Sequence, residues 1–210
     1  MKRVFIISAL MLFCFVPASF AVFGLEAGLN YNSVTMSSDY MNIEESGSGT
    51  AFHFGGYYNY PLKGKSEYLK LALGMTTRKV KVEASEGGAT YTMEPDMKSF
   101  DIAVLYMKPA ANNPKLTYIA GMTVVKETDG NVKYSYSEPG YSESTTDSVD
   151  DDDLETDFFI TGGLKYQMSN NIYPEVKLQY NLSPSRDFWD SDVEFSNYFT
   201  ILFSVAMEFE

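Results

Sequence analysis

His53 is the only histidine in the sequence and the first residue to consider for chemistry. A histidine acts as a catalytic base only when a nucleophile and an orienting carboxylate lie within its reach. The sequence places no serine with an aspartate or glutamate beside His53. We therefore interpret His53 as a polar residue that faces inward or lies at a rim. We predict no catalytic residue, no metal ligand and no cofactor.

Six further charged residues share a face with small and polar residues in segments of alternating pattern: Glu26, Lys70, Asp101, Lys165, Glu175 and Lys177. These side chains could line a polar conduit, or they could pair and fill the interior of a small barrel. An eight-stranded barrel is only just wide enough for side chains to fill it. Because unpaired interior charges are costly, the presence of both signs favours a paired plug over a conduit.

A third candidate is an acidic segment that contains Asp147, Glu155, Asp157 and the run from Asp150 to Asp153. Carboxylate oxygens are ligands for hard cations such as calcium. The spacing does not match an EF-hand loop, in which acidic residues alternate and a glycine makes the turn. We interpret the segment as a solvated acidic loop. Weak bridging by divalent ions to anionic lipopolysaccharide is the alternative.

Eight segments position these residues, and each of them alternates between apolar and polar side chains, as strands do. The last segment has the clearest pattern, because Phe199, Ile201, Phe203, Val205, Met207 and Phe209 fall on one face. Such a stripe needs a permanent cover, and under lipid every backbone group must be paired in a closed barrel. The eight predicted strands are residues 23–33, 51–60, 67–76, 99–108, 115–126, 157–168, 172–182 and 197–209.

The connections between these strands alternate in length. Long loops are predicted at residues 36–50, 84–96, 127–155 and 183–196, and short turns at residues 61–66, 109–114 and 169–171. This is the layout of bacterial outer-membrane barrels, with short periplasmic turns and long outer loops. Asp129-Gly130 is a hairpin signal, and we expect the third long loop to form a hairpin that stands out of the barrel. Lys79 and Lys81 in outward positions indicate that the third strand has left the membrane there.

The N-terminus has the pattern of a secretory signal peptide. Lys2 and Arg3 precede an apolar run at residues 4–16, and Ser19 and Ala21 are the small residues of a cleavage site. The run is too short for a membrane-spanning helix, which needs about 20 apolar residues. A lipoprotein signal at Cys14 is disfavoured because Phe13 precedes it. We predict that residues 1–21 are removed and that residues 22–210 form one barrel domain.

Composition narrows the classes of function. Without Lys2 and Arg3 the formal net charge changes from −12 to −14, which argues against a nucleic-acid partner. Cys14 is the only cysteine, so the processed chain has no disulfide. Tyrosine and phenylalanine are abundant, as is typical of strands and of membrane interfaces. Candidates for interfacial girdles are Tyr31, Tyr58, Tyr60, Tyr68, Tyr106, Tyr118, Tyr166 and Tyr180.

Three short motifs carry a resemblance to a known family: residues 99–106 (SFDIAVLY), Ala120-Gly121 and Gly162-Gly163. With these motifs, residues 22–210 resemble the small eight-stranded outer-membrane β-barrels of the OmpX/OmpA-barrel type and the PorT-like outer membrane protein beta-barrel domain. The chain departs from that pattern at Ala103, where the PorT-like group often has proline, and at Glu210, which follows the terminal aromatic residue. The resemblance implies fold more than function.

Together these observations predict an all-β, eight-stranded, antiparallel up-and-down transmembrane β-barrel in the outer membrane of a diderm bacterium. We expect a monomer with a non-enzymatic, structural or surface-interaction role through long acidic extracellular loops. The expected partners are outer-membrane lipid and lipopolysaccharide, the barrel assembly machinery, and an extracellular ligand or surface that the loops contact. A narrow passive channel for small solutes is the alternative, and a lipid-modifying barrel enzyme that uses His53 is less favoured.

Overall fold

The structure is a computed structural model, and it describes residues 22–38, 43–62, 66–150, 154–183, 186–187 and 193–209. The predicted signal peptide and the acidic residues Asp151, Asp152 and Asp153 lie outside this part of the chain. The regular elements of the described part are all β-strands. Among the described residues, no helix is both long enough and apolar enough to cross a membrane.

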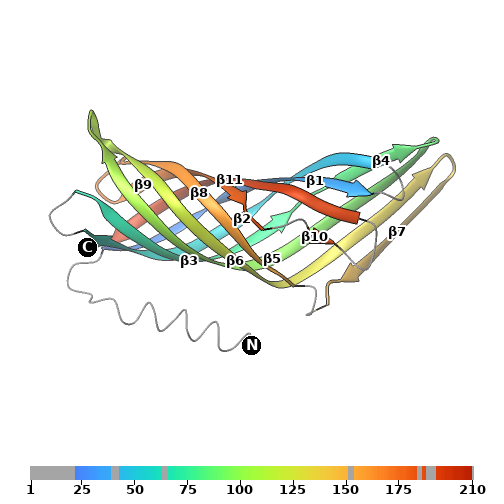
Figure 1. Cartoon of the computed structure of the whole chain (residues 1–210), viewed down its shortest axis with the longest axis horizontal. Helices are drawn as coiled ribbons and strands as arrows, with labels where there is room; N and C mark the ends of the chain where they lie inside the picture. The colour runs from blue at the N-terminus through green and yellow to red at the C-terminus, as the bar shows by residue number, and fades with distance from the viewer. Residues whose placement is uncertain are drawn as a thin grey trace.

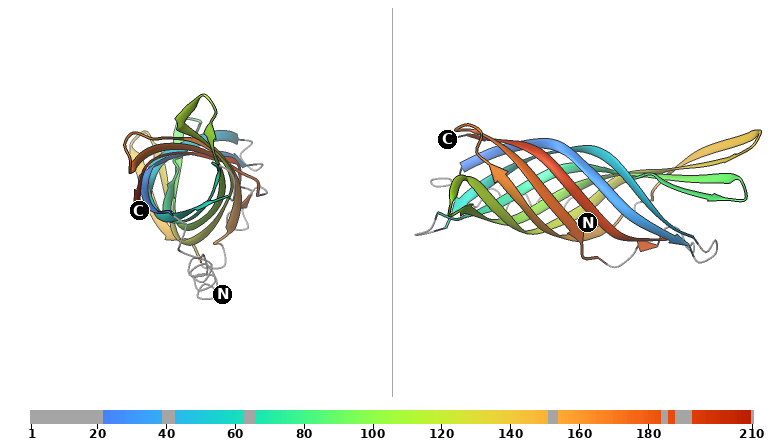
Figure 2. Two further views of the ribbon diagram at one scale, coloured as in Figure 1. Left: turned by 90° about the vertical axis from the view of Figure 1, so that its left-hand side faces the viewer. Right: turned by 90° about the horizontal axis from the view of Figure 1, so that it is seen from above.

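Eight of the strands close into a ring, which Figure 2 shows end-on. Each strand pairs antiparallel with the next, and β1 pairs with both β2 and β11, so the sheet closes on itself. The predicted eight-stranded antiparallel barrel is confirmed. The ring consists of β1 (Val22–Ser38), β2 (Ile43–Pro61), β3 (Tyr68–Lys79), β5 (Ala89–Ala110), β6 (Asn113–Glu138), β8 (Thr156–Tyr166), β9 (Ile172–Asn181) and β11 (Val193–Phe209).

Three short strands lie in the connections: β4 (Val82–Glu86), β7 (Tyr141–Ser148) and β10 (Arg186–Asp187). β5 and β6 continue beyond the ring, where β4 pairs with β5 and β7 pairs with β6. We call the resulting four-stranded extension the protruding sheet; it comprises β4, residues 89–95 of β5, residues 131–138 of β6, and β7. It projects from the end of the barrel opposite the C-terminus (Figure 1).

The hairpin within the third long loop turns at a different place from the one that Asp129-Gly130 indicates. Asp129 and Gly130 lie inside β6, opposite Lys98 and Met97 of β5, and the turn falls at Gly140, whose φ is 88°. The physical reason is that β5 offers β6 a backbone partner well beyond the ring. A β-bulge at Thr128 shifts the register between β5 and β6, so that Lys98 lies opposite Asp129 and Ser99 lies opposite Glu127. The Thr128 hydroxyl donates a 3.2 Å hydrogen bond to the Lys98 carbonyl. The prediction of a projecting hairpin was right, and its turn residue was wrong.

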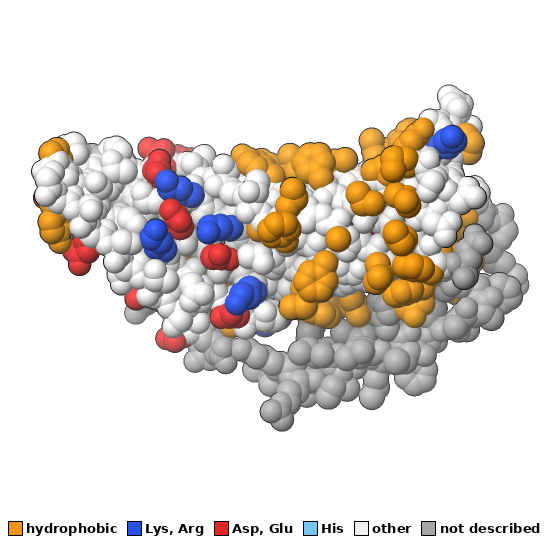
Figure 3. All heavy atoms as spheres, turned by 180° about the vertical axis from the view of Figure 1, so that it is seen from behind, with side chains coloured by type: hydrophobic (Ala, Val, Ile, Leu, Met, Phe, Trp, Pro, Cys, Tyr) orange, Lys and Arg blue, Asp and Glu red, His pale blue; other side chains and the backbone are white. Residues whose placement is uncertain are grey.

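The outer surface of the ring carries an apolar belt. Leu29, Leu178 and Val205 on three adjacent strands are 51%, 54% and 55% exposed. In Figure 3 hydrophobic side chains cover the barrel itself, and charged side chains gather between this belt and the protruding sheet. Exposure of so much apolar surface is stable only in contact with lipid, and a closed ring leaves no unpaired backbone edge there.

The interior has two layers of different chemistry. Near the protruding sheet it is apolar, with a buried cluster made of Val34, Met36, Val80, Val82, Met97, Val132, Val149 and Leu154. Farther from the protruding sheet than this cluster, the lumen is filled with charged and polar side chains.

Candidate functional site

Four buried charges from three strands form an alternating square across the lumen. Lys70 Nζ lies 2.8 Å from Glu26 Oε2 and 2.9 Å from Glu175 Oε2. Lys177 Nζ lies 2.9 Å from Glu26 Oε2 and 3.2 Å from Glu175 Oε2. None of the four residues is more than 5% exposed. We call this group the ion-pair square; because every charge in it touches two of opposite sign, the lumen charges are paired here, as the plug interpretation requires.

Small residues on the neighbouring strands make room for the square. Glu26 of β1 lies opposite Ala206 of β11 and Gly55 of β2. Because alanine has a short side chain and glycine has none, the Glu26 carboxylate can extend into the lumen without meeting a bulky neighbour on the barrel wall. Alternation along β1 and β9 turns Glu26, Glu175 and Lys177 inward. The side-chain pattern of the sequence therefore determines which residues face the lumen, and the closed register determines which of them meet.

His53 lies in the lumen, with both ring nitrogens near oxygen atoms. Nε2 is 3.0 Å from Glu26 Oε1, and Nδ1 is 2.8 Å from Thr76 Oγ1. The Thr76 hydroxyl donates a 2.5 Å hydrogen bond to Asp101 Oδ2. The structure thus brings together a histidine, a hydroxyl and two carboxylates that sequence reasoning did not place beside one another. The hydroxyl proton points to Asp101 and away from His53, which is not the arrangement of a nucleophile activated by a base.

The space beside His53 is too small for a substrate. The cavity that His53, Glu26 and Lys177 help to line has a volume of about 20 Å³, which is room for about one water molecule. A second cavity around Arg78 measures about 60 Å³. The histidine is therefore enclosed by the hydrogen bonds and ion pairs that fill the barrel.

Two more ion pairs extend the network on either side of the square, and each contains one residue that the sequence analysis did not name as a lumen charge, Arg78 or Glu208. Arg78 Nη2 lies 3.5 Å from Asp101 Oδ2, and its guanidinium carbon lies 4.8 Å from the centre of the Phe159 ring. Lys165 pairs with Glu208. Arg78 and Glu208 continue the inward alternation of β3 and β11, so the period of two that identified the other charges also marks these two.

The protruding sheet has two unlike faces. Tyr91 and Tyr136 are in register on one face, and Met93 and Tyr134 follow at the next pair of that face. The opposite face is polar; Glu94, Lys133 and Thr146 lie side by side across it. The apolar face continues the lumen side of the barrel wall, since Met97 and Val132 farther along the same face belong to the buried cluster.

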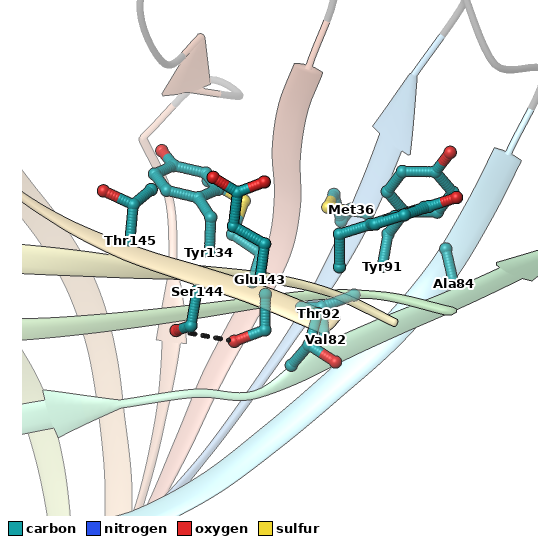
Figure 4. Close-up of a pocket in the computed structure, with 12 residues that line it drawn as sticks. Met36, Val82, Ala84, Tyr91, Thr92, Tyr134, Glu143, Ser144 and Thr145 are labelled. Atoms are coloured by element: carbon teal, nitrogen blue, oxygen red, sulfur yellow. Dashed lines mark hydrogen bonds between the residues drawn. The ribbon is translucent and has the colours of Figure 1, made fainter. Parts of the chain in front are cut away.

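A pocket of about 310 Å³ lies between this apolar face and Met36 near the end of β1. Figure 4 shows Tyr134, Glu143 and Tyr91 rising from one side of the sheet, whereas Ser144 lies on the other side with its hydrogen bond. Burial raises the pKa of Tyr134. Its phenol is therefore neutral at physiological pH, and the pocket is a predominantly apolar space with one carboxylate.

Comparison with known families identifies this architecture. Residues 18–187 match the profile of the family described as "Outer membrane protein beta-barrel domain". The chain belongs to this family. The protein is accordingly located in the outer membrane, and the resemblance inferred from the sequence is confirmed. A search of curated protein sequences finds no significant match.

Solved structures of small outer-membrane barrels are similar to this family member at low sequence identity. Ail, the attachment invasion locus protein of Yersinia pestis, is 15% identical, with 89% of this chain and 98% of Ail covered and a TM-score of 0.40. Neisserial surface protein A is 13% identical, with coverages of 89% and 97% and a TM-score of 0.39. OprG from Pseudomonas aeruginosa is 10% identical, with coverages of 91% and 97% and a TM-score of 0.44.

In this outer-membrane barrel, ion pairs mark the level at which the strands leave the lipid. Lys98 Nζ lies 2.7 Å from Asp129 Oδ2, and Lys79 Nζ lies 3.9 Å from Asp96 Oδ2. The four side chains are about half exposed. Lys79 is thus outside the apolar belt, as predicted. Of the predicted acidic segment, Asp147 and Asp150 are exposed, and Asp151, Asp152 and Asp153 lie outside the described residues.

Proposed function

We propose that this protein is a non-enzymatic, monomeric outer-membrane barrel that anchors the protruding sheet at the cell surface, where the sheet contacts an external partner. The observation that carries the proposal is the contrast between the two parts of the molecule. The lumen is crossed by the ion-pair square, whereas β4 to β7 extend a four-stranded sheet beyond the apolar belt.

The filled lumen supports an anchor over a channel. Opposite charges in direct contact within a low-dielectric interior hold one another in place, and separating them to open a path would leave each unpaired. The cavity beside His53 has room for about one water molecule and the cavity beside Arg78 for a few, and neither has room for a hydrated solute. The same enclosure of His53 supports a non-enzymatic role.

The charge of the protruding segments favours a basic partner. Residues 81–98 carry four acidic and two basic side chains, and residues 127–150 carry six acidic and one basic. Complementary charge steers association and suppresses partners of like charge. We therefore propose a cationic protein or surface as the external partner. Lipopolysaccharide is the proposed neighbour at the level of the ion pairs, and the barrel assembly machinery is the proposed partner during insertion.

Adhesion of vesicles that carry the protein tests this function. Vesicles with the intact barrel are passed over surfaces coated with lysozyme, with heparin or with neutral dextran. The matched variant joins Asn131 to Ser148 through two glycines. This removes the projecting hairpin, Val132 of the buried cluster included, and keeps the part of β6 that pairs with β8 in the ring. We expect retention on lysozyme that the variant loses, and retention of both proteins on dextran at the level of empty vesicles. Equal retention of the two proteins on lysozyme would overturn the proposed role.

Two measurements separate the alternatives. Discrete conductance steps from the intact protein in a planar bilayer would establish the narrow channel and contradict the plug. A change in lipid A structure between cells with and without the protein, lost in His53→Ala, would establish a lipid-modifying enzyme. We expect neither result.

We also propose that residues 1–21 are a signal peptide cleaved after Ala21, on the evidence of the sequence pattern. N-terminal sequencing of protein purified from the outer membrane should begin at Val22. An N-terminus at Met1, or a lipid-modified Cys14, would contradict the proposal.

A further inference from the structure

We propose that the pocket on the apolar face of the protruding sheet binds a small organic cation, with an ammonium group carried on an aromatic or branched apolar body. The pocket shares Tyr134, Tyr136 and Glu143 with the projecting hairpin, but it would bind a small ligand, which the attachment role does not require. The inference therefore does not depend on that role.

One wall of the pocket suits an apolar body. Met36 of β1, Val82 and Ala84 of β4 and Met93 of β5 line it together. Met36 and Val82 are also members of the buried cluster, so this wall is backed by packed side chains. The volume of about 310 Å³ lies at the lower end of the range for small-molecule sites, roughly 300–1,000 Å³. Methionine side chains adapt to ligands of differing shape.

The other wall suits a positive charge. The rings of Tyr91 and Tyr136 lie 5.0 Å apart, tilted by 50°, and the Tyr134 ring lines the same pocket. Faces of aromatic rings attract ammonium groups. Glu143 lies opposite Tyr136 in the register and adds a carboxylate to the same wall. The three rings and the carboxylate together form a site for a cation.

A hydrogen bond to Glu143 and a second nearby carboxylate make this wall selective for positive ligands. The Tyr141 hydroxyl donates a 2.7 Å hydrogen bond to Glu143 Oε2, which holds the carboxylate on the sheet. Asp147 adds its negative charge beside Tyr134, where it helps to raise the pKa of the phenol. Among the described residues that line the pocket, Glu143 alone is charged. A carboxylate ligand would therefore be repelled, and a neutral ring would gain only the apolar contacts.

Three probes of one shape and different charge test the proposal: tyramine, 4-ethylphenol and 3-(4-hydroxyphenyl)propionate. The full-length protein is placed in lipid nanodiscs with ¹³C-labelled methionine methyl groups. Met36 and Met93 report on the pocket, and Met75 and Met122, which are 49% and 50% exposed on the lipid-facing surface, report on partitioning into lipid. We expect saturable shifts at Met36 and Met93 with tyramine, and an affinity at least about fivefold weaker for the propionate. Shifts that do not saturate, or that are equal at Met75 and Met122, would overturn the proposal.

Substitutions then assign the two walls. Glu143→Gln should weaken tyramine binding about two- to fivefold and leave 4-ethylphenol unchanged, whereas Glu94→Gln, the same change on the opposite face, should alter neither. Tyr91→Leu should weaken tyramine about two- to fivefold, and Tyr91→Phe should restore it because the ring face is kept. Equal affinities for the three probes, or equal effects of Glu143→Gln and Glu94→Gln, would refute a cation site. The titrations measure binding of a small molecule by the intact protein, and the adhesion assay measures retention on a coated surface, so the two proposals can fail separately although the hairpin variant also removes Glu143.

Discussion

Replacement of Glu26 by glutamine tests whether the ion-pair square holds the barrel closed. Glu26 pairs with Lys70 at 2.8 Å and with Lys177 at 2.9 Å, and its Oε1 lies 3.0 Å from His53 Nε2. Glutamine has nearly the same volume as glutamate but no charge. Its amide nitrogen is a hydrogen-bond donor, and it would face the donating ammonium groups of Lys70 and Lys177. Two buried lysines would then share the single carboxylate of Glu175.

The expected loss of stability follows from these contacts. Removing one partner of a buried ion pair costs about 3–5 kcal/mol, because the other charge is left uncompensated. Glu175 still reaches both lysines, at 2.9 and 3.2 Å, which places Glu26→Gln near the lower end, at about 3 kcal/mol. The assay is urea unfolding in lipid vesicles, followed by the mobility of unboiled samples on a gel, with free energies taken by linear extrapolation.

A second substitution decides whether charge pairing is the cause. The double variant Glu26→Gln, Lys177→Met leaves one balanced pair, Lys70 with Glu175, so it should be more stable than Glu26→Gln alone. We expect a coupling energy of at least about 1–2 kcal/mol. Glu83→Gln, which removes the half-exposed partner of Lys81, should change stability by less than about 1 kcal/mol. Additive effects of the two lumen substitutions, or a Glu26→Gln barrel as stable as the parent, would refute the square as a structural plug.

Three further predictions concern the barrel wall and the tip of the projecting hairpin. A Cβ at Gly163 would lie 2.3 Å from the Val176 carbonyl oxygen, whereas a Cβ at Gly162 would meet no atom nearer than 4.0 Å. In the same urea assay Gly163→Ala should therefore lower the free energy of unfolding by about 1–3 kcal/mol, and Gly162→Ala should lower it by less than about 0.5 kcal/mol. Equal effects would contradict the close approach of β8 and β9. Leu178→Lys places a charge on the lipid-facing surface and should cost about 2–4 kcal/mol, while Thr146→Lys on the protruding sheet should be neutral; a neutral Leu178→Lys would refute the lipid contact. Gly140 has a φ of 88°, which alanine adopts only with strain, so Gly140→Ala should destabilise the hairpin by about 1–2 kcal/mol. Hydrogen exchange of the β7 amides should become faster, and urea unfolding of the barrel should not change. Unchanged exchange would contradict a positive φ at this turn.

The sequence alone determined which side chains face lipid and which face the lumen. The period of two in each segment is a local property of extended backbone, and it correctly assigned Leu178 to the lipid-facing surface and Lys177 to the lumen. The alternation of long and short connections likewise indicated an even-numbered barrel with both ends of the domain on one side. Arg78 and Glu208 were missed as network members although the same period marks them.

The tertiary structure alone decided which inward charges meet and how the outer end is built. Glu26 and Lys177 are 151 residues apart in the chain, and only closure of β11 onto β1 brings their strands to facing positions around the lumen. Asp129-Gly130 is a turn signal in isolation, but pairing with β5 overrides it and moves the turn to Gly140. The pocket of Tyr91, Tyr136 and Glu143 exists because three strands align these side chains on one face. Local side-chain direction can be read from residue order, whereas contacts across the lumen and the sheet depend on register, which is set only when the ring closes.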